Sequence, residues 1–561
     1  MIEFKLFGNK AYSWNLKENQ YFTGYFSDEN NLFYSGESAI DFLLNIGKQN
    51  TTDPKLNGIY SFIKTTPNGI EITTDTINYF PLFFLKKHDC WFVSDNWNYL
   101  VDTKGGIMPN VEVKTEFQSI GFVLDNETLD KEIFKTRAGE KLLLNHDGTL
   151  ERIPNYFFLP DFFSDDNFHE LSELLISELC EAGKRLVKFL DNRTAILPLS
   201  GGFDSRLIAC ILKNHHYENV ICFTYGRRNS EVEISRKTAQ TLGYKWLFVD
   251  YNEIDLENYL DDSCFLEYVA FAGNGFSMPY LQEYFAVKKL VQEAIVPLNS
   301  VFLPGHVGDN IAGSYILKSI KTKTPPNKLH NNLIDTYFFF KKNSKDEKIW
   351  IKNRISKTLL TYPEKNIYAA SYNPFIEDWS VKEKFSKFLF HSSKVFDFWG
   401  YETYFLFWDV KLVTFFRNLP FKFRENKLLY DEVATKYFFT KYNVFYSHEE
   451  MKTSLFDIKV QIIKNRLRDF FPWKLVLRIM KNHDKIFYSE LTSVMEKEMA
   501  QNGFRRIKRY RSYNAVICRW YLYFMSKDLN KVATYSSSPN KYIATANQML
   551  SLKNCYRNKR N

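Results

Sequence analysis

One short segment of the chain has residues suited to binding a phosphate group. It is Ser200-Gly-Gly-Phe-Asp-Ser205, and the residues concerned are Ser200, Gly201, Gly202, Asp204 and Ser205. Two adjacent glycines let the main chain approach an anion closely. The serine hydroxyls add hydrogen-bond donors, and the carboxylate of Asp204 is a hard oxygen ligand of the kind that Mg²⁺ prefers. We therefore predict a phosphate site with an associated magnesium ion; the alternative is a purely structural turn.

The flanking segments would place this loop at the start of a helix. Ile196–Leu199 is an apolar run typical of a short buried strand, and after the loop apolar residues recur at helical spacing. A strand, a glycine turn and a helix in this order direct backbone N–H groups toward an anion. The chain lacks Gly-x-x-x-x-Gly-Lys-Ser/Thr and Gly-x-Gly-x-x-Gly, which excludes the common P-loop and the dinucleotide loop. The segment instead resembles the pyrophosphate loop of ATP pyrophosphatases, which cleave ATP between the α and β phosphates.

From about residue 168 onward, helical patterns alternate with apolar runs. Strands are expected at 196–199, 220–225, 246–249 and 300–303, and helices at 169–186, from 205 and at 230–242. This alternation predicts a parallel sheet with helices on both faces, whose ligands bind beyond the carboxyl ends of the strands. Leu199 and Ser200 lie at that edge, as do Tyr225 and Gly226 on the next strand, so we assign all four to a nucleotide site. Beyond about residue 380 we expect helices only.

A second glycine turn follows the apolar run at 300–303. Pro304 and Gly305 begin this turn, and Asp309 provides its carboxylate. A magnesium ion between phosphates often takes only one or two protein carboxylates. We therefore predict that Asp204 and Asp309 together bind Mg²⁺; for Asp309 alone, a helix N-cap is the alternative.

Together, the two loops resemble the signatures of the asparagine synthetase family, which includes the β-lactam synthetases. Leu199–Ser205 is similar to Leu-Ser-Gly-Gly-x-Asp-Ser, and Pro304–Tyr315 aligns with the second glycine-rich signature. Later segments that resemble family motifs follow in the right order, at 231–243, 400–409, 419–420 and 427–432. The resemblance implies an α/β synthetase domain of the PP-loop type with a helical extension, placed at 166–530. It also implies ATP and Mg²⁺ as cofactors, and adenylation of a carboxylate.

Residues 1–165 have the pattern of a mainly antiparallel β domain. Alternating segments occur at 58–63, 69–73, 81–85, 91–94, 141–145 and 149–153. The segments 75–84, 91–95 and 137–140 resemble the glutaminase domain of the same family, which implies an Ntn-type α/β/β/α sandwich. That class needs a cysteine as the first residue of the mature chain, but position 2 is Ile2 and the first cysteine is Cys90. We therefore expect an inactive glutaminase-like domain, with nitrogen supplied by ammonia, an amine or a separate protein.

Three further residues receive catalytic roles from the resemblance. His306 stands where the family has Glu or Tyr, and Glu402 aligns with a Glu that can support such a tyrosine. A His–Glu pair can act as a general base with its orienting carboxylate. We expect His306, held by Glu402, to deprotonate the attacking amine or bind the acyl-adenylate; the alternative is that both are structural. Lys452 is the expected cation beside the oxyanion and the pyrophosphate, with Lys427 as the alternative.

Positive charge is concentrated at the end of the chain. Residues 501–561 contain thirteen Lys or Arg and one acid, so the net charge of +9 leaves the rest slightly acidic. Such a segment could attract nucleic acid or an anionic membrane, but we favour a solvated helix face and a basic tail at 531–561, without a nucleic-acid partner. No apolar run is long enough to span a membrane, and the N-terminus lacks a signal-peptide pattern. The seven cysteines form no Cys-x-x-Cys pair, so we expect a cytoplasmic protein without a zinc site.

The sequence as a whole predicts an AMP-forming amide ligase of the asparagine synthetase type, with aspartate as the default carboxylate. One alternative is a tailoring enzyme that amidates another carboxylate, for example in a sugar or a peptide. Another is a PP-loop tRNA-modifying enzyme, which usually needs cysteine pairs that this chain lacks. A silent nucleotide-binding protein is the third. The expected partners are a small-molecule carboxylate and an ammonia or amine donor; the oligomeric state is open, with a homodimer as one option.

Overall fold

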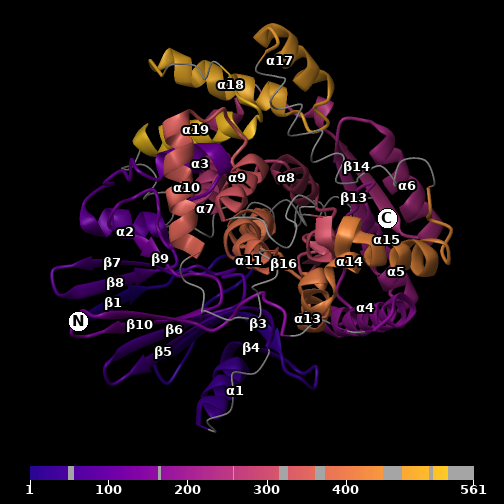
Figure 1. Cartoon of the computed structure of the whole chain (residues 1–561), viewed down its shortest axis with the longest axis horizontal. Coiled ribbons are helices and arrows are strands. Elements are labelled where there is room, and N and C mark those ends of the chain that lie inside the picture. Colours follow the sequence, from indigo (N-terminus) through magenta and orange to yellow (C-terminus); the bar gives the residue numbers. More distant parts are fainter. Residues whose placement is uncertain are drawn as a thin grey trace, which may run out of the picture.

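The chain forms two N-terminal β-sheets, a central parallel sheet and a largely helical C-terminal part (Figure 1). The computed structural model describes residues 1–48, 56–161, 164, 166–256, 258–314, 326–359, 373–446, 470–504 and 509–527. The smaller N-terminal sheet has the order β1 (Ile2–Lys5), β8 (Cys90–Ser94), β7 (Phe83–Lys87) and β9 (Phe134–Lys135). The larger one has the order β11 (Leu150–Pro154), β10 (Glu140–Asn145), β6 (Gly69–Thr74), β5 (Asn57–Thr66), β3 (Gln20–Ser27) and β2 (Asn15–Lys17), with β4 (Phe33–Ser35) also paired to β3.

The two N-terminal sheets face each other, and each has a helix on its outer face. Ile63 and Ile72 of the larger sheet pack with Phe84 of the smaller one in a shared apolar cluster. On the outer faces, α1 (Gly36–Lys48) packs on β3, and α2 (Trp97–Lys104) packs on β7 and β8. Because successive side chains of a strand point to opposite faces of the sheet, each sheet can pack against the other sheet on one face and against a helix on the other. The layer order is the one expected of a four-layer sandwich; assignment to the Ntn class stays a prediction.

The central sheet is parallel throughout. Its order is β14 (Lys245–Asp250), β13 (Val220–Gly226), β12 (Ala195–Pro198), β15 (Val301–Phe302) and β16 (Glu402–Thr403). Four of these strands were predicted from the apolar runs. The fifth, β16, corrects the expectation of helices only beyond about residue 380, because a two-residue strand is too short to show an alternating pattern.

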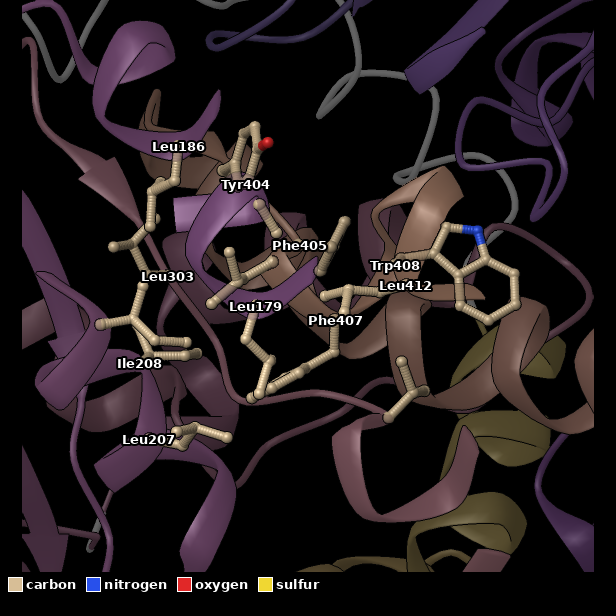
Figure 2. Close-up of a cluster of buried hydrophobic side chains, with 14 of the residues drawn as sticks. Leu179, Leu186, Leu207, Ile208, Leu303, Tyr404, Phe405, Phe407, Trp408 and Leu412 are labelled. Carbon is tan, nitrogen blue, oxygen red and sulfur yellow. The ribbon is translucent and has the colours of Figure 1, made fainter. Parts of the chain in front are cut away.

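Helices cover both faces of this sheet, as the alternation of segments predicts. Leu197 and Leu303 pack on one face against α4 (Phe168–Leu190), α5 (Phe203–Asn214) and α6 (Ser230–Leu242). Ile196 and Phe302 pack on the other face against α7 (Ser263–Gly273), α8 (Tyr284–Gln292) and α12 (Lys394–Trp399). Figure 2 shows the first face, where leucines of α4 and α5 meet Leu303 and the aromatic segment 404–408. The sheet is therefore rigidly held between two apolar layers.

The N-terminal sheets are hydrogen-bonded to the C-terminal part as well as packed on it. The hydroxyl of Tyr25 donates to the carbonyl of Thr403 at 2.9 Å, and that of Tyr79 donates to Asp397 at 2.9 Å. Tyr12, Tyr25 and Phe158 belong to the same apolar cluster as α4 and α5. Because the two parts share one apolar core, the predicted domain boundaries (1–165, 166–530 and 531–561) stay a prediction. Residues 531–561 lie outside the part of the chain that the structure describes.

The remaining α-helices complete the C-terminal part. They are α9 (Pro326–Tyr337), α10 (Lys345–Leu359), α11 (Asn373–Trp379), α13 (Val410–Asn418), α14 (Phe421–Arg424), α15 (Leu428–Val433), α17 (Trp473–Asn482), α18 (Tyr488–Gln501) and α19 (Asn514–Lys527). Two of them, α10 and α19, pack on α3 (Lys114–Ile120). Among the helices that the structure describes, none has the length and apolar character needed to cross a membrane.

Candidate active site

The first glycine loop connects β12 to α5, as the strand–turn–helix pattern predicts. The N–H group of Ser200 donates to the Oγ of Ser205 at 3.0 Å, and that of Gly202 donates to the Oγ of Ser200 at 3.2 Å. Gly202 is the N-cap of α5 and has no side chain to cap the helix. The N–H groups of the first turn, which have no partner within a helix, are therefore free of a side-chain cap and suited to an anion.

A buried arginine that the sequence analysis did not single out holds this loop. The Arg206 side chain is 0% exposed, and its guanidinium group donates to the carbonyl of Gly201 and, at 3.3 Å, to that of Val444. The guanidinium group also lies over the rings of Phe439 and Tyr446. No local pattern marks such a residue, because its partners other than Gly201 come from a segment more than 200 positions away in the sequence.

The second loop brings its carboxylate to the first. The N–H group of Asp309 donates to Oδ2 of Asp204 at 3.0 Å, and the hydroxyl of Tyr430 donates to Oδ1 at 2.7 Å. The close approach requires Gly308, since a β-carbon there would lie 2.8 Å from the Cγ of Asp204. Asp204 and Asp309 thus meet as predicted. Tyr430 lies within the 427–432 segment, but the sequence gave no reason to assign it a role.

The carboxyl groups of Asp204 and Asp309 are both buried and lie close enough for the charge of Asp309 to affect Asp204. Burial, together with the charge of Asp309, raises the pKa of Asp204 to about 7. Burial also raises the pKa of Asp309, and nearby Lys427 opposes that increase. A divalent cation would relieve the repulsion between the two carboxylates. No cluster of three or more His, Cys, Asp or Glu suited to a metal occurs in the described residues, but Mg²⁺ shared with phosphates needs only one or two carboxylates.

Lys427 provides a cation at the site. Its side chain is buried, with the ammonium group 3.1 Å from Asp431 and 5.2 Å from the ring centre of Phe203. It lines the same cavity as the first loop. The role assigned to Lys452 cannot be placed, because that residue lies outside the described part of the chain. Lys427, the alternative named for the same role, is the one of the two that the structure places at the cavity, and the role of Lys452 stays a prediction.

The structure does not bring Glu402 to His306, which corrects the predicted pair. The carboxylate of Glu402 forms an ion pair with the guanidinium group of Arg193. Arg193 precedes β12 and Glu402 begins β16, so both residues lie at the amino edge of the parallel sheet. His306 follows the end of β15 at the opposite, carboxyl edge, where its Nε2 lies 3.1 Å from the Ser392 hydroxyl. Burial lowers the pKa of His306 to about 4. The imidazole is thus neutral near pH 7, and no carboxylate among the described residues is hydrogen-bonded to it.

A cavity of about 780 Å³ lies over both loops. The predicted residues that line it are Leu199, Ser200, Gly201, Gly202, Asp204, Ser205, Tyr225, Pro304, Gly305, His306 and Asp309. Gly226, which was also assigned to the nucleotide site, does not line the cavity. Its φ is 109°, and a β-carbon at this position would lie 2.5 Å from the carbonyl oxygen of Lys485. This glycine lets segment 485–486 approach the cavity wall. Lys485 itself pairs with Glu231 at 2.5 Å.

Comparison with known proteins gives one family match over this region. Residues 191–442 match the family model for asparagine synthase. Both loops and Lys427 fall within that range. Among solved structures, an NH3-dependent NAD synthetase from Campylobacter jejuni subsp. jejuni NCTC 11168, in complex with the nitrate ion, matches with 16% identity and a TM-score of 0.20, over 36% of this chain and 99% of that chain. No curated protein gave a significant match.

Proposed function

We propose that the chain is an ATP-dependent ligase that activates a carboxylate as its acyl-adenylate and transfers the acyl group to nitrogen. The observation that carries this proposal is the meeting of Asp204 and Asp309 beside the uncapped start of α5 in one cavity. Two carboxylates for a cation and N–H groups for an anion together fit a magnesium–pyrophosphate group. The family match over 191–442 supports the same chemistry.

The reaction would proceed in two displacements. A carboxylate oxygen of the substrate attacks the α-phosphorus of ATP, the bond from that phosphorus to the bridging oxygen breaks, and pyrophosphate leaves. A nitrogen nucleophile then attacks the acyl carbon, AMP leaves with the electrons of the C–O bond, and the nitrogen loses a proton. Aspartate and ammonia are the default substrates of the proposal; another acid or amine would use the same steps.

The described residues have separate roles in this scheme. The N–H groups at the start of α5, with the hydroxyls of Ser200 and Ser205, would bind the departing pyrophosphate. Asp204 and Asp309 would hold Mg²⁺, which supplies neutralising charge between the phosphates. Lys427 would stabilise the negative charge that develops as the phosphorus–oxygen bond breaks.

Exchange of labelled pyrophosphate into ATP tests the proposal, because it requires adenylation but no nitrogen nucleophile. We expect exchange that depends on Mg²⁺ and on one acid from a panel headed by aspartate. Asp204→Asn and Asp309→Asn should each reduce it by about 100-fold or more. Asp261→Asn is the matched control, since Asp261 is exposed and does not line the cavity. Absence of exchange with every acid, despite tight binding of Mg-ATP, would contradict the ligase proposal and favour a silent nucleotide-binding protein.

The nitrogen source is tested by product formation. With the acid that supports exchange, ammonium, simple amines and glutamine are compared as nitrogen donors. Use of ammonium or an amine but not of glutamine is expected. Equal turnover with glutamine as the sole nitrogen source would contradict that expectation.

A further inference from the structure

A chain of hydrogen bonds on one wall of the cavity ends at a carboxylate. The hydroxyl of Tyr280 donates to Oε1 of Gln282 at 2.8 Å, and Nε2 of Gln282 donates to the hydroxyl of Tyr225 at 2.9 Å. The hydroxyl of Tyr225 then donates to Oε1 of Glu283 at 3.1 Å. All four residues line the cavity. They come from the end of β13 and the turn before α8, so two rigid elements position them.

The second oxygen of this carboxylate is buried without a partner. Glu283 is 6% exposed, and its Oε2 has no hydrogen-bond partner among the described residues. It is the N-cap of α8, but its side chain does not cap the helix. The groups that face Glu283 come from β13, segment 280–282, the 3₁₀ turn at 251, α7 and α18. They are phenols and an amide, none of them cationic: Tyr225, Tyr280, Gln282, Tyr251, Tyr268 and Tyr488. A buried carboxylate in such surroundings lacks the charge partner that it normally has.

The chemistry of this cavity wall indicates which kind of ligand group would bind the unpaired oxygen of Glu283. An ionised carboxylate accepts hydrogen bonds and cannot donate them, so the missing partner is a donor. A cationic donor also offsets the buried charge, which a hydroxyl does not. The rings of Tyr225 and Tyr251 are stacked with their centres 5.5 Å apart, and aromatic faces attract ammonium groups. A protonated primary amine satisfies all three conditions.

We propose that Glu283, with Tyr225, Gln282 and Tyr280, forms a subsite for the ammonium group of a substrate. The inference rests on the proposed ligase function, in which such a group is either the nitrogen nucleophile before it loses its proton or the amino group of an amino-acid carboxylate. Glu283 holds this group on the wall beside the adenylation site, and the phenol–amide chain fixes the carboxylate in place.

The first experiment measures binding without turnover. Thermal unfolding of the full chain is followed in ammonium or methylammonium chloride, with tetramethylammonium chloride at equal ionic strength as the reference. Ammonium and methylammonium should raise the unfolding temperature relative to tetramethylammonium, which has no N–H donor. Glu283→Gln should abolish the difference. Glu293→Gln, the same change at the exposed far end of α8, should retain it. A difference that survives in Glu283→Gln would overturn the subsite.

The second experiment identifies which substrate carries the ammonium group. If it is the acid, Glu283→Gln should raise the KM of an amino-acid substrate in pyrophosphate exchange at least tenfold, without affecting the analogue that lacks the amino group. If it is the nucleophile, exchange should be unchanged and only the KM of the amine should rise. A rise confined to the KM of ATP would show that Glu283 contacts the nucleotide and not an ammonium group, and would overturn the proposal. Absence of exchange in the unmodified protein would contradict the ligase, while the ammonium titration still decides the subsite.

Discussion

Glu283→Gln should stabilise the protein against unfolding at alkaline pH, because it replaces a buried carboxyl group that can ionise with a neutral amide. Burial raises the pKa of Glu283 from 4.5 to about 7. The unfolded chain therefore loses this proton at a lower pH than the folded protein does, and stability falls as pH rises between these two values. Each factor of ten in proton affinity is worth about 1.4 kcal/mol, so at about pH 8 the buried charge costs about 3 kcal/mol. At about pH 5 the same cost is below about 1 kcal/mol.

Urea unfolding of the ligand-free protein across this pH range measures the effect. The neutral glutamine does not titrate, so the stability gained by Glu283→Gln should grow by about 2 to 3 kcal/mol between about pH 5 and about pH 8. Any fixed cost of accommodating the amide is the same at both pH values and cancels from this difference. Glu293→Gln should show no such growth, because that carboxylate is exposed. A constant difference between Glu283→Gln and the unmodified protein would show that the pKa of Glu283 is the same in the folded and unfolded protein, and would refute the reasoning.

Three further changes test the site and its support. Gly308→Ala should abolish pyrophosphate exchange while leaving the protein folded by circular dichroism, because the new methyl group would displace Asp204; full activity would show that the two loops can separate without loss. Lys427→Met should lower the rate of exchange by about 100-fold with a smaller effect on the binding of Mg-ATP, and a purely structural role would instead lower both through unfolding. Asp409→Asn should destabilise the fold by about 3 to 5 kcal/mol in urea, because it breaks a buried pair with Arg185, whose contacts are 2.6 and 2.8 Å. A loss below about 1 kcal/mol would show that water reaches the arginine.

Local sequence patterns predicted the parts of the fold whose periodicity is strong. The apolar run before Ser200 and the helical spacing after it placed the first loop correctly, and the second apolar run did so for Asp309. Strand β3, in contrast, was not singled out. Its burial lacks a clean alternation because both of its faces are covered: Phe22 and Phe26 pack with α1 on one face, and Tyr25 packs into the cluster with α4 and α5 on the other. A strand with both faces covered loses the period-two signal.

The site residues that were missed or misplaced depend on tertiary contacts. Arg206, Tyr430 and Glu283 act through partners that are distant in the sequence or through a turn with no apolar pattern. Glu402 shows the opposite error, since an alignment of motifs fixes the order of residues but not the edge of the sheet at which they lie. Glu402 begins the parallel strand β16, so its side chain lies at the amino edge of the sheet, where it pairs with Arg193 and not with His306.

The hydrogen bonds from Tyr25 and Tyr79 into the C-terminal part limit how this protein can be divided. A fragment that begins at residue 166 would expose the apolar surface of α4 and leave the carbonyl of Thr403, in the strand next to the one that leads into His306, without its donor. The N-terminal sheets thus act as an internal scaffold for the C-terminal part, whatever chemistry either part carries out. Selection for a folded C-terminal part would therefore retain these sheets even if they had no reaction of their own. Expression of residues 166–530 together with 1–165 as separate chains should therefore yield soluble material where either fragment alone does not.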